Sequence, residues 1–222
     1  MTNNVLDFLE NSASKYPDKI AVKEEERSVS YALLAEESQK IGSALAQTAA
    51  AGTPVGVYME KGIDALCAFF GIVYAGAFYS MLNPELPDMR LQQIQSVLKA
   101  KVLIAAPDLK DKAVELFPDA IVFTAEELRK SEIDGSRLKA IRDQAIDTDP
   151  LYLNFTSGST GIPKGIAVAH RSVIDFIGCF TDLFSIGPED VIANQAPFDF
   201  DVSVKDIYSA IKTGATLVIV PR

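Results

Sequence analysis

Short apolar runs alternate along the chain with longer stretches of helical periodicity. The runs PVGVYM, AFYSML and KVLIAA have the character of strands, whereas stretches such as PDMRLQQIQSVLKA place apolar residues every three or four positions. Strands that alternate with helices of ten or more residues imply βαβ units and parallel pairing. The pattern therefore predicts an α/β fold of largely parallel sheets flanked by helices.

The same pattern gives each expected element an approximate extent. Helices are expected at residues 5–16, 31–47, 62–76, 87–100, 171–184 and 202–214, and strands at residues 54–59, 77–82, 101–106, 120–124, 151–155, 165–170, 190–196 and 215–222. Residues 19–31 are predicted to form a hairpin with EEER at its turn. Ser30 is a candidate helix N-cap, and Thr124 and Glu127 have the spacing of a capping box.

Two stretches need a separate interpretation. The polar, weakly periodic residues 129–150 are expected to form a surface connection, with a possible subdivision of the chain near residues 130–150. The most apolar window, residues 65–82, contains two glycines and is expected to be a buried helix leading into a strand, not a membrane span. Since no secretory signal opens the chain, we expect a cytoplasmic protein without a membrane partner.

Charge and the rarer residue types narrow the possible chemistry. With 21 Lys and Arg against 30 Asp and Glu, the formal charge is −9, which argues against a nucleic-acid partner. His170 is the single histidine, so no zinc site is expected. Cys67 and Cys179 lie far apart in apolar sequence and are expected to be buried free thiols, as in a reducing compartment.

The segment NFTSGSTGIPKG, residues 154–165, is too polar to pack into a core. Its glycines let backbone N–H groups approach an anion, its hydroxyls add donors, and Lys164 adds a positive charge, which together suit phosphate oxygens. It is not a Walker A loop, because Pro163 precedes the lysine and a strand, not a helix, is expected next. On composition alone, the alternative is a flexible surface hairpin.

Longer stretches carry a resemblance to a known family. LYLNFTSGSTGIPKG closely resembles the phosphate-binding loop of the adenylate-forming enzymes, which include acyl-CoA synthetases, luciferases and the adenylation domains of nonribosomal peptide synthetases. VSYALLAEESQKIGSAL and GIVYAGAFYSMLNPELP are similar to two earlier segments of that family. The resemblance runs along essentially the whole chain and implies that residues 1–222 are the N-terminal portion of the family's large domain.

The resemblance implies a reaction and its ligands. In the family, a carboxylate attacks the α-phosphorus of Mg-ATP to give an acyl adenylate and pyrophosphate, and a thiol then takes the acyl group. ATP and Mg²⁺ are thus the implied cofactors. The residues implied to hold the β- and γ-phosphates are Thr156, Ser157, Gly158, Ser159, Thr160 and Gly161. Lys164 is implied to neutralise the departing pyrophosphate.

The segment APFDFDVSVKDIYSAI is similar to the Phe-Asp-x-Ser segment of amino-acid-activating members. The resemblance implies that Asp201 binds the α-amino group of the substrate. It also implies that Phe200, Val202 and Lys205 lie in the substrate site. The alternative role for Asp201 is a helix N-cap. Lys205 stands where members commonly place an apolar or aromatic residue. In one interpretation, Lys205 turns outward or pairs with Asp206 or Asp201. In the other, it recognises an acidic side chain of the substrate.

The sequence NQAPFDFDVSVKDIYSAIKTGATLVIVP is most similar to D-alanine–carrier-protein ligases and adenylation domains, which implies an amino acid and a carrier protein with a phosphopantetheine thiol as partners. The competing hypotheses are an acyl-CoA synthetase of the same superfamily and a non-catalytic, truncated module that binds a nucleotide or a partner. The family's magnesium-binding glutamate, its ribose-binding aspartate and its C-terminal lid with a catalytic lysine do not occur here. Residues 1–222 alone are therefore expected to contain no catalytic residue and to be inactive.

Overall fold

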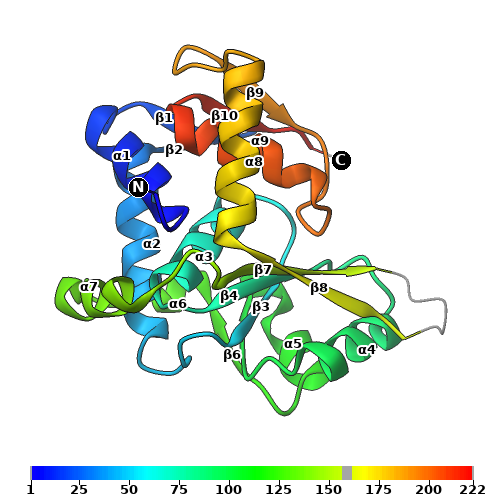
Figure 1. Ribbon diagram of the computed structural model, residues 1–222. Coiled ribbons are helices and arrows are strands. Elements are labelled where there is room, and N and C mark those ends of the chain that lie inside the picture. Colours follow the sequence, from blue (N-terminus) through cyan, green and yellow to red (C-terminus); the bar gives the residue numbers. More distant parts are fainter. Residues whose placement is uncertain (1, 157–161, 222) are drawn as a thin grey trace.

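The computed structural model describes residues 2–156 and 162–221, which form two sheets with helices between and around them (Figure 1). The smaller sheet has four strands in the order β2–β1–β10–β9, and the larger has six in the order β6–β5–β3–β4–β7–β8. All neighbouring strands are parallel except β1–β2 and β7–β8, which are antiparallel. The predicted α/β fold with largely parallel sheets is confirmed.

Each sheet takes strands from both halves of the chain. The strands of the smaller sheet are β1 (Ile20–Glu24), β2 (Arg27–Ser30), β9 (Val191–Asn194) and β10 (Thr216–Ile219). Those of the larger sheet are β3 (Pro54–Tyr58), β4 (Phe78–Leu82), β5 (Val102–Ala105), β6 (Ile121–Thr124), β7 (Pro150–Thr156) and β8 (Lys164–Ala169). The sheets therefore mark no boundary near residues 130–150, and the subdivision there stays a prediction.

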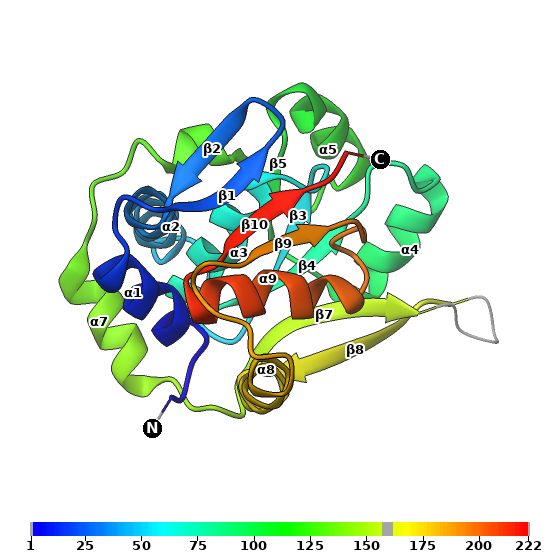
Figure 2. The ribbon, with the colours of Figure 1, turned by 90° about the horizontal axis from the view of Figure 1, so that it is seen from above.

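Helices pack on both sheets (Figure 2). They are α1 (Leu6–Lys15), α2 (Tyr31–Leu45), α3 (Ile63–Tyr74), α4 (Asp88–Leu98), the 3₁₀ turn η1 (Pro107–Leu109), α5 (Lys110–Leu116), α6 (Ala125–Leu128), α7 (Gly135–Gln144), α8 (His170–Leu183) and α9 (Val202–Thr213). Three of them differ from the expectation: η1 and α5 are additional, and α7 occupies the predicted surface connection. α7 buries only Leu138, so its sequence carries no apolar stripe that would predict a helix.

α3 forms the centre of the core between the two sheets. Every residue of α3 except Asp64 is buried, and the helix contacts β1 of the smaller sheet as well as β3 and β4 of the larger one. This burial accounts for the apolar window at residues 65–82, which comprises most of α3 and the fully buried β4. None of the helices in the described part of the chain is long and apolar enough to cross a membrane.

Local polar contacts confirm two predicted helix starts. Ser30 Oγ accepts a hydrogen bond from the backbone N–H of Leu33 at 3.3 Å at the start of α2. Thr124 and Glu127 form a complete capping box at α6, in which each side chain accepts a hydrogen bond from the other residue's backbone N–H. These contacts satisfy backbone donors that the first turn of a helix leaves unpaired.

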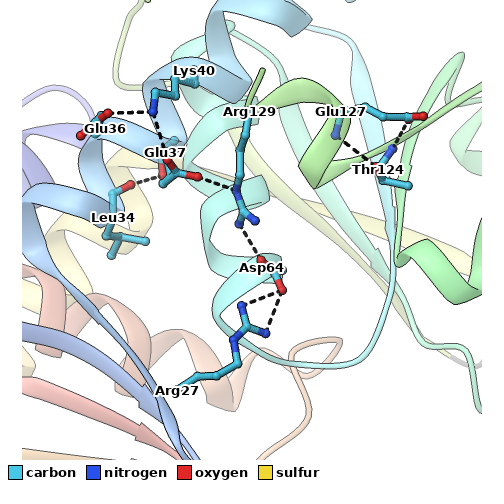
Figure 3. A network of polar contacts seen from close by, with 10 residues as sticks. Arg27, Leu34, Glu36, Glu37, Lys40, Asp64, Thr124, Glu127 and Arg129 are labelled. Atoms are coloured by element: carbon cyan, nitrogen blue, oxygen red, sulfur yellow. Dashed lines mark hydrogen bonds and ion pairs between the residues drawn. The ribbon is translucent and has the colours of Figure 1, made fainter. Parts of the chain in front are cut away.

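Arg129, which follows α6, joins three helices in a partly buried ion-pair network (Figure 3). Its Nη2 lies 2.6 Å from Asp64 Oδ1 on α3, and its Nε lies 2.9 Å from Glu37 Oε2 on α2. Arg27 on β2 lies 3.1 Å from the other carboxylate oxygen of Asp64. Burial alone would raise the pKa of Asp64, but the hydrogen bonds from Arg129 and Arg27 outweigh it and lower the pKa.

The two cysteines differ in their exposure. Both are free thiols, as predicted, but Cys67 is buried whereas Cys179 is exposed on α8. The expectation that Cys179 is buried is wrong because its apolar neighbours are themselves exposed: Phe176 is 48% and Phe184 62% accessible. These two rings flank Phe180 in a row along α8, with ring centroids 5.7 and 4.7 Å apart.

Candidate functional site

The hydroxyl-rich segment connects two paired strands. β7 and β8 are antiparallel, and Thr156 lies opposite Lys164 in their register. Both residues are exposed at the end of this pair. Five residues of this segment lie outside the described part of the chain: Ser157, Gly158, Ser159, Thr160 and Gly161. Their phosphate contacts therefore stay predictions, and the structure places only the two ends of the segment.

A hollow of about 430 Å³ extends from Thr156 to the start of α9. Strands and the segment before α9 both contribute to its lining, which consists of Tyr152, Asn154, Phe155, Thr156, Ile166, Val168, Asp199, Phe200 and Asp201. A second hollow, of about 340 Å³, shares Tyr152, Val168 and Asp201 with the first and also includes Val202 and Lys205. The fold thus brings the predicted substrate residues to the same place as the base of the predicted phosphate loop.

Asp201 directly precedes α9 but does not cap it. Its backbone is already helical, with φ −60° and ψ −24°, and its side chain makes no capping hydrogen bond. A capping residue needs an extended backbone so that its side chain can reach back to the N–H groups of the first turn. The N-cap alternative for Asp201 is therefore wrong. The residue is exposed and borders both hollows, so its carboxylate is available to a ligand.

Buried tyrosines hold the middle of α9 against the larger sheet. The hydroxyls of Tyr208 on α9 and Tyr79 on β4 are hydrogen-bonded at 2.9 Å. Tyr79 is the register partner of Tyr152 on β7, and their ring centroids are 5.8 Å apart. Burial, and then the negative charge of Asp201, raises the pKa of Tyr152 to about 12. Tyr152 therefore keeps its proton beside Asp201, a role that the sequence analysis missed.

The other predicted substrate residues lie around Asp201. Phe200 and Val202 are 56% and 46% accessible and border one hollow each. Lys205 Nζ lies 2.5 Å from Asp206 Oδ1, and the second oxygen of Asp206 accepts a hydrogen bond from Asn194 Nδ2 at 3.1 Å. Of the alternatives for Lys205, pairing with Asp206 is confirmed. The recognition of an acidic substrate side chain stays a proposal.

Asp199 is a second carboxylate in the larger hollow, and the sequence analysis gave it no role. It is half-buried, and burial raises its pKa, although a backbone hydrogen bond and the amide of Asn83 oppose that rise. Within the described ranges, no group of three or more His, Cys, Asp or Glu residues is placed to hold a metal ion.

Comparison with known proteins identifies relatives of this chain. The sequence model described as AMP-binding enzyme matches residues 9–222. D-alanine–D-alanyl carrier protein ligase from Lacticaseibacillus rhamnosus is 28% identical over 222 residues, which cover all of this chain and 43% of that protein. One of the subunits of linear gramicidin synthase from Brevibacillus parabrevis is 31% identical over 216 residues, which cover 96% of this chain and 4% of that protein. The chain spans less than half the length of these relatives.

Solved structures of similar fold agree with these sequence matches. The nonribosomal peptide synthetase FmoA3 in its α-methyl-L-serine-AMP-bound form has a TM-score of 0.88 at 26% identity, over 98% of this chain and 24% of that chain. VinN with 3-methylaspartate has a TM-score of 0.84 at 21% identity, over 97% of this chain and 62% of that chain, which is a likeness of fold alone. With the family match across residues 9–222, these comparisons show that the chain belongs to the AMP-binding enzyme family.

Proposed function

We propose that the chain is the N-terminal portion of an adenylation domain that activates an amino acid carboxylate with ATP. The observation that carries this proposal is that one hollow is bordered both by Thr156, which precedes the rest of the hydroxyl-rich segment, and by Asp201. Such a hollow suits a substrate with an ammonium at one end and a phosphate at the other. A substrate carboxylate oxygen attacks the α-phosphorus, the bond to pyrophosphate breaks, and an aminoacyl adenylate and pyrophosphate result.

The proposed roles follow from charge and position. Asp201 pairs with the substrate ammonium, and Tyr152 borders the same hollow. Thr156 and Lys164, at the two described ends of the hydroxyl-rich segment, would hold the phosphates, and a bound Mg²⁺ would supply further neutralisation of their charge. Phosphoryl chemistry of this kind depends on positioning and charge neutralisation more than on covalent help from the protein.

The second step concerns the intact protein. The curated relatives include a ligase named for a D-alanyl carrier protein and part of a gramicidin synthase, and these names support an acceptor of the carrier-protein class. The thiolate of a phosphopantetheine arm attacks the acyl carbon of the adenylate, a thioester forms, and AMP leaves. The chain spans 43% of the carrier-protein ligase, so we propose this step only for the intact protein.

An ATP–pyrophosphate exchange assay of the intact protein tests the proposal. We expect exchange with amino acids such as alanine and none with propionate or octanoate. These two acids have no ammonium group, so Asp201 would face an alkyl chain without a counter-charge. Exchange with octanoate alone would instead support an acyl-CoA synthetase, and nucleotide binding without exchange would support a non-catalytic module. Faster exchange with aspartate than with alanine would favour recognition of an acidic side chain by Lys205.

The 222-residue chain alone serves as the comparison in the same assay. We expect it to give no amino-acid-dependent exchange, because the ribose-binding aspartate and the lid lysine of the family do not occur in its sequence. Exchange at the rate of the intact protein would show that these parts are not needed here.

A further inference from the structure

Exposed apolar side chains gather along one side of α8. Phe176, Phe180 and Phe184 form a row of rings on this helix, and the neighbouring Leu183 is 78% accessible. Apolar residues of β8 and of the start of α9 extend the row. The whole group, named here the α8 face, consists of Ile166, Phe176, Phe180, Leu183, Phe184, Phe200 and Val202. Scattered apolar residues are ordinary on a protein surface, whereas a contiguous group marks an interaction site.

The α8 face is continuous with the candidate substrate site. Phe176 lines the smaller hollow at Asp201 together with Val202, and Ile166 lines the larger one together with Phe200. Each of these four apolar side chains is nevertheless about half accessible to water. Both hollows therefore open toward the α8 face, and their apolar walls are incomplete within the described part of the chain.

Two unpaired sheet edges lie near this face. β8 is the last strand of the larger sheet and β9 the last strand of the smaller one, and neither has a partner on its outer side among the described residues. α8 follows β8 and precedes β9 in the chain, and Figure 2 shows β9 as the strand of the smaller sheet nearest to α8. Native proteins cover or extend such edges, because their free N–H and C=O groups invite pairing with another strand.

The position of β10 indicates where the smaller sheet can be extended. β1 and β9 already pair with its two sides, so no further strand fits directly beside β10. A strand that followed β10 through a crossover connection would find the free edge of β9 one position away. Such an extension would place additional polypeptide next to the α8 face.

We propose that the α8 face is covered by the part of the intact protein that lies outside these 222 residues, with one of its strands on the free edge of β9. This inference rests on the proposed function, in which the chain is a portion of a larger adenylation domain. The chain spans 43% of the carrier-protein ligase, so a protein of that length has enough further polypeptide for such a cover. The cover completes the apolar walls of both hollows and excludes water, which strengthens the contact between Asp201 and a substrate ammonium.

Cys179 reports on the cover, because it is exposed one helical turn from both Phe176 and Leu183. Its thiol is alkylated with iodoacetamide in the 222-residue chain and in the intact protein, and the labelled peptides are quantified by mass spectrometry. We expect Cys179 to react at least about tenfold more slowly in the intact protein, whereas Cys67, buried in α3, resists in both. Glu126→Cys, at an exposed position of α6 outside the α8 face, is the control and should react equally in both proteins.

Two results of this labelling experiment would overturn the inference. Equal rates at Cys179 would show that the α8 face stays open in the intact protein. Protection of Cys179 in the 222-residue chain itself, growing with its concentration, would assign the face to a second copy. The labelling needs neither ATP nor amino acid, so exchange activity together with equal labelling would refute the cover alone and leave the proposed function in place.

A charge placed on the α8 face gives a second, independent measurement. Leu183→Asp is expected to leave the midpoint of urea unfolding of the 222-residue chain unchanged, because the side chain is exposed there. In the intact protein it should lower the midpoint by at least about 0.5 M, because the cover buries the charge. Met89→Asp on α4, 70% accessible and outside the α8 face, should change neither midpoint. An unchanged midpoint of the intact protein carrying Leu183→Asp would contradict the proposed cover.

Discussion

Thr156 and Lys164 bring a hydroxyl and an ammonium to the same end of the β7–β8 pair. A lysine ammonium acts on phosphate mainly as a point charge, without the fixed geometry of a guanidinium. Its contribution should therefore concern ATP and pyrophosphate, while the contacts of the amino acid at Asp201 are unaffected. At the scale of single residues, we propose that the nucleotide binds toward Thr156 and Lys164 and the amino acid toward Asp201.

Replacement of Lys164 by Ala tests that separation. In the intact protein we expect the KM for ATP to rise at least about tenfold, because a charge-assisted phosphate contact is lost. The KM for the amino acid should stay within about twofold, because this substrate is held at the other end of the hollow. Initial rates of pyrophosphate exchange measure both constants, with the exposed Lys130→Ala as control. Unchanged ATP affinity and turnover would contradict a phosphate role for Lys164.

His170, the first residue of α8, is a buried neutral base. Its Nδ1 accepts a hydrogen bond from the backbone N–H of Val5 at 3.2 Å. Burial, and then the positive charge of Arg142, lowers its pKa from 6.5 to about 4. Between these two values the unfolded chain binds a proton that the folded chain does not, so stability falls as the pH falls. The lone histidine of the sequence is thus part of the core packing near the N-terminus.

The pH dependence of unfolding tests this account of His170. The contribution of His170 should be fully present above pH 6.5 and decline by up to about 3 kcal/mol as the pH approaches 4. His170→Asn keeps an acceptor for the Val5 N–H but cannot take up a proton, so it should remove that part of the decline. Urea unfolding at several pH values gives both curves. Equal losses of stability in the two proteins would show that His170 is not the responsible group.

At the scale of secondary structure, the elements that pack on a sheet were the predictable ones. α3 and β4 bury nearly all of their residues, and their apolar sequence predicted them directly. α7 was not predicted, because a helix that buries only Leu138 is held by polar contacts such as the Asp134 cap, which carry little periodic signal. The pattern of apolar residues also did not predict which strands share a sheet, because β1 pairs with β10 almost two hundred residues later in the chain.

Arg129 holds three helices together, and its replacement should be costly. We expect Arg129→Met to lower the free energy of unfolding by about 2 kcal/mol, because it removes a cation from between two partly buried carboxylates. Asp64 then keeps its pair with Arg27, and Glu37 its pair with Lys40. The control is Arg171→Met, which removes a pair with Asp147 at 2.8 Å. The Arg171 side chain is 58% accessible against 19% for Arg129, so its loss should cost less than about 1 kcal/mol. If urea unfolding gave similar losses of stability for the two variants, burial would not determine how much these ion pairs contribute to stability.

At the scale of the whole molecule, the site exists because two sheets meet. Asp201 lies at the start of α9, which packs on β9 and β10, whereas Thr156 ends β7 of the larger sheet. The sequence resemblance named both residues, but their common hollow follows from the packing of α9 against β4 through Tyr208 and Tyr79. Tyr152 and Asp199 could not be assigned from sequence, because their roles depend on what lies opposite them in the folded chain.

The most direct test of the account is pyrophosphate exchange by the intact protein carrying Asp201→Asn, with alanine and other amino acids as substrates. We predict that amino-acid-dependent exchange falls about a hundredfold or more, because a substrate ammonium loses its only proposed counter-charge while the shape of the residue is kept. Asp182→Asn, an exposed change on α8 away from both hollows, should keep the wild-type rate. Wild-type exchange in Asp201→Asn would contradict the claim that this carboxylate binds the substrate amino group.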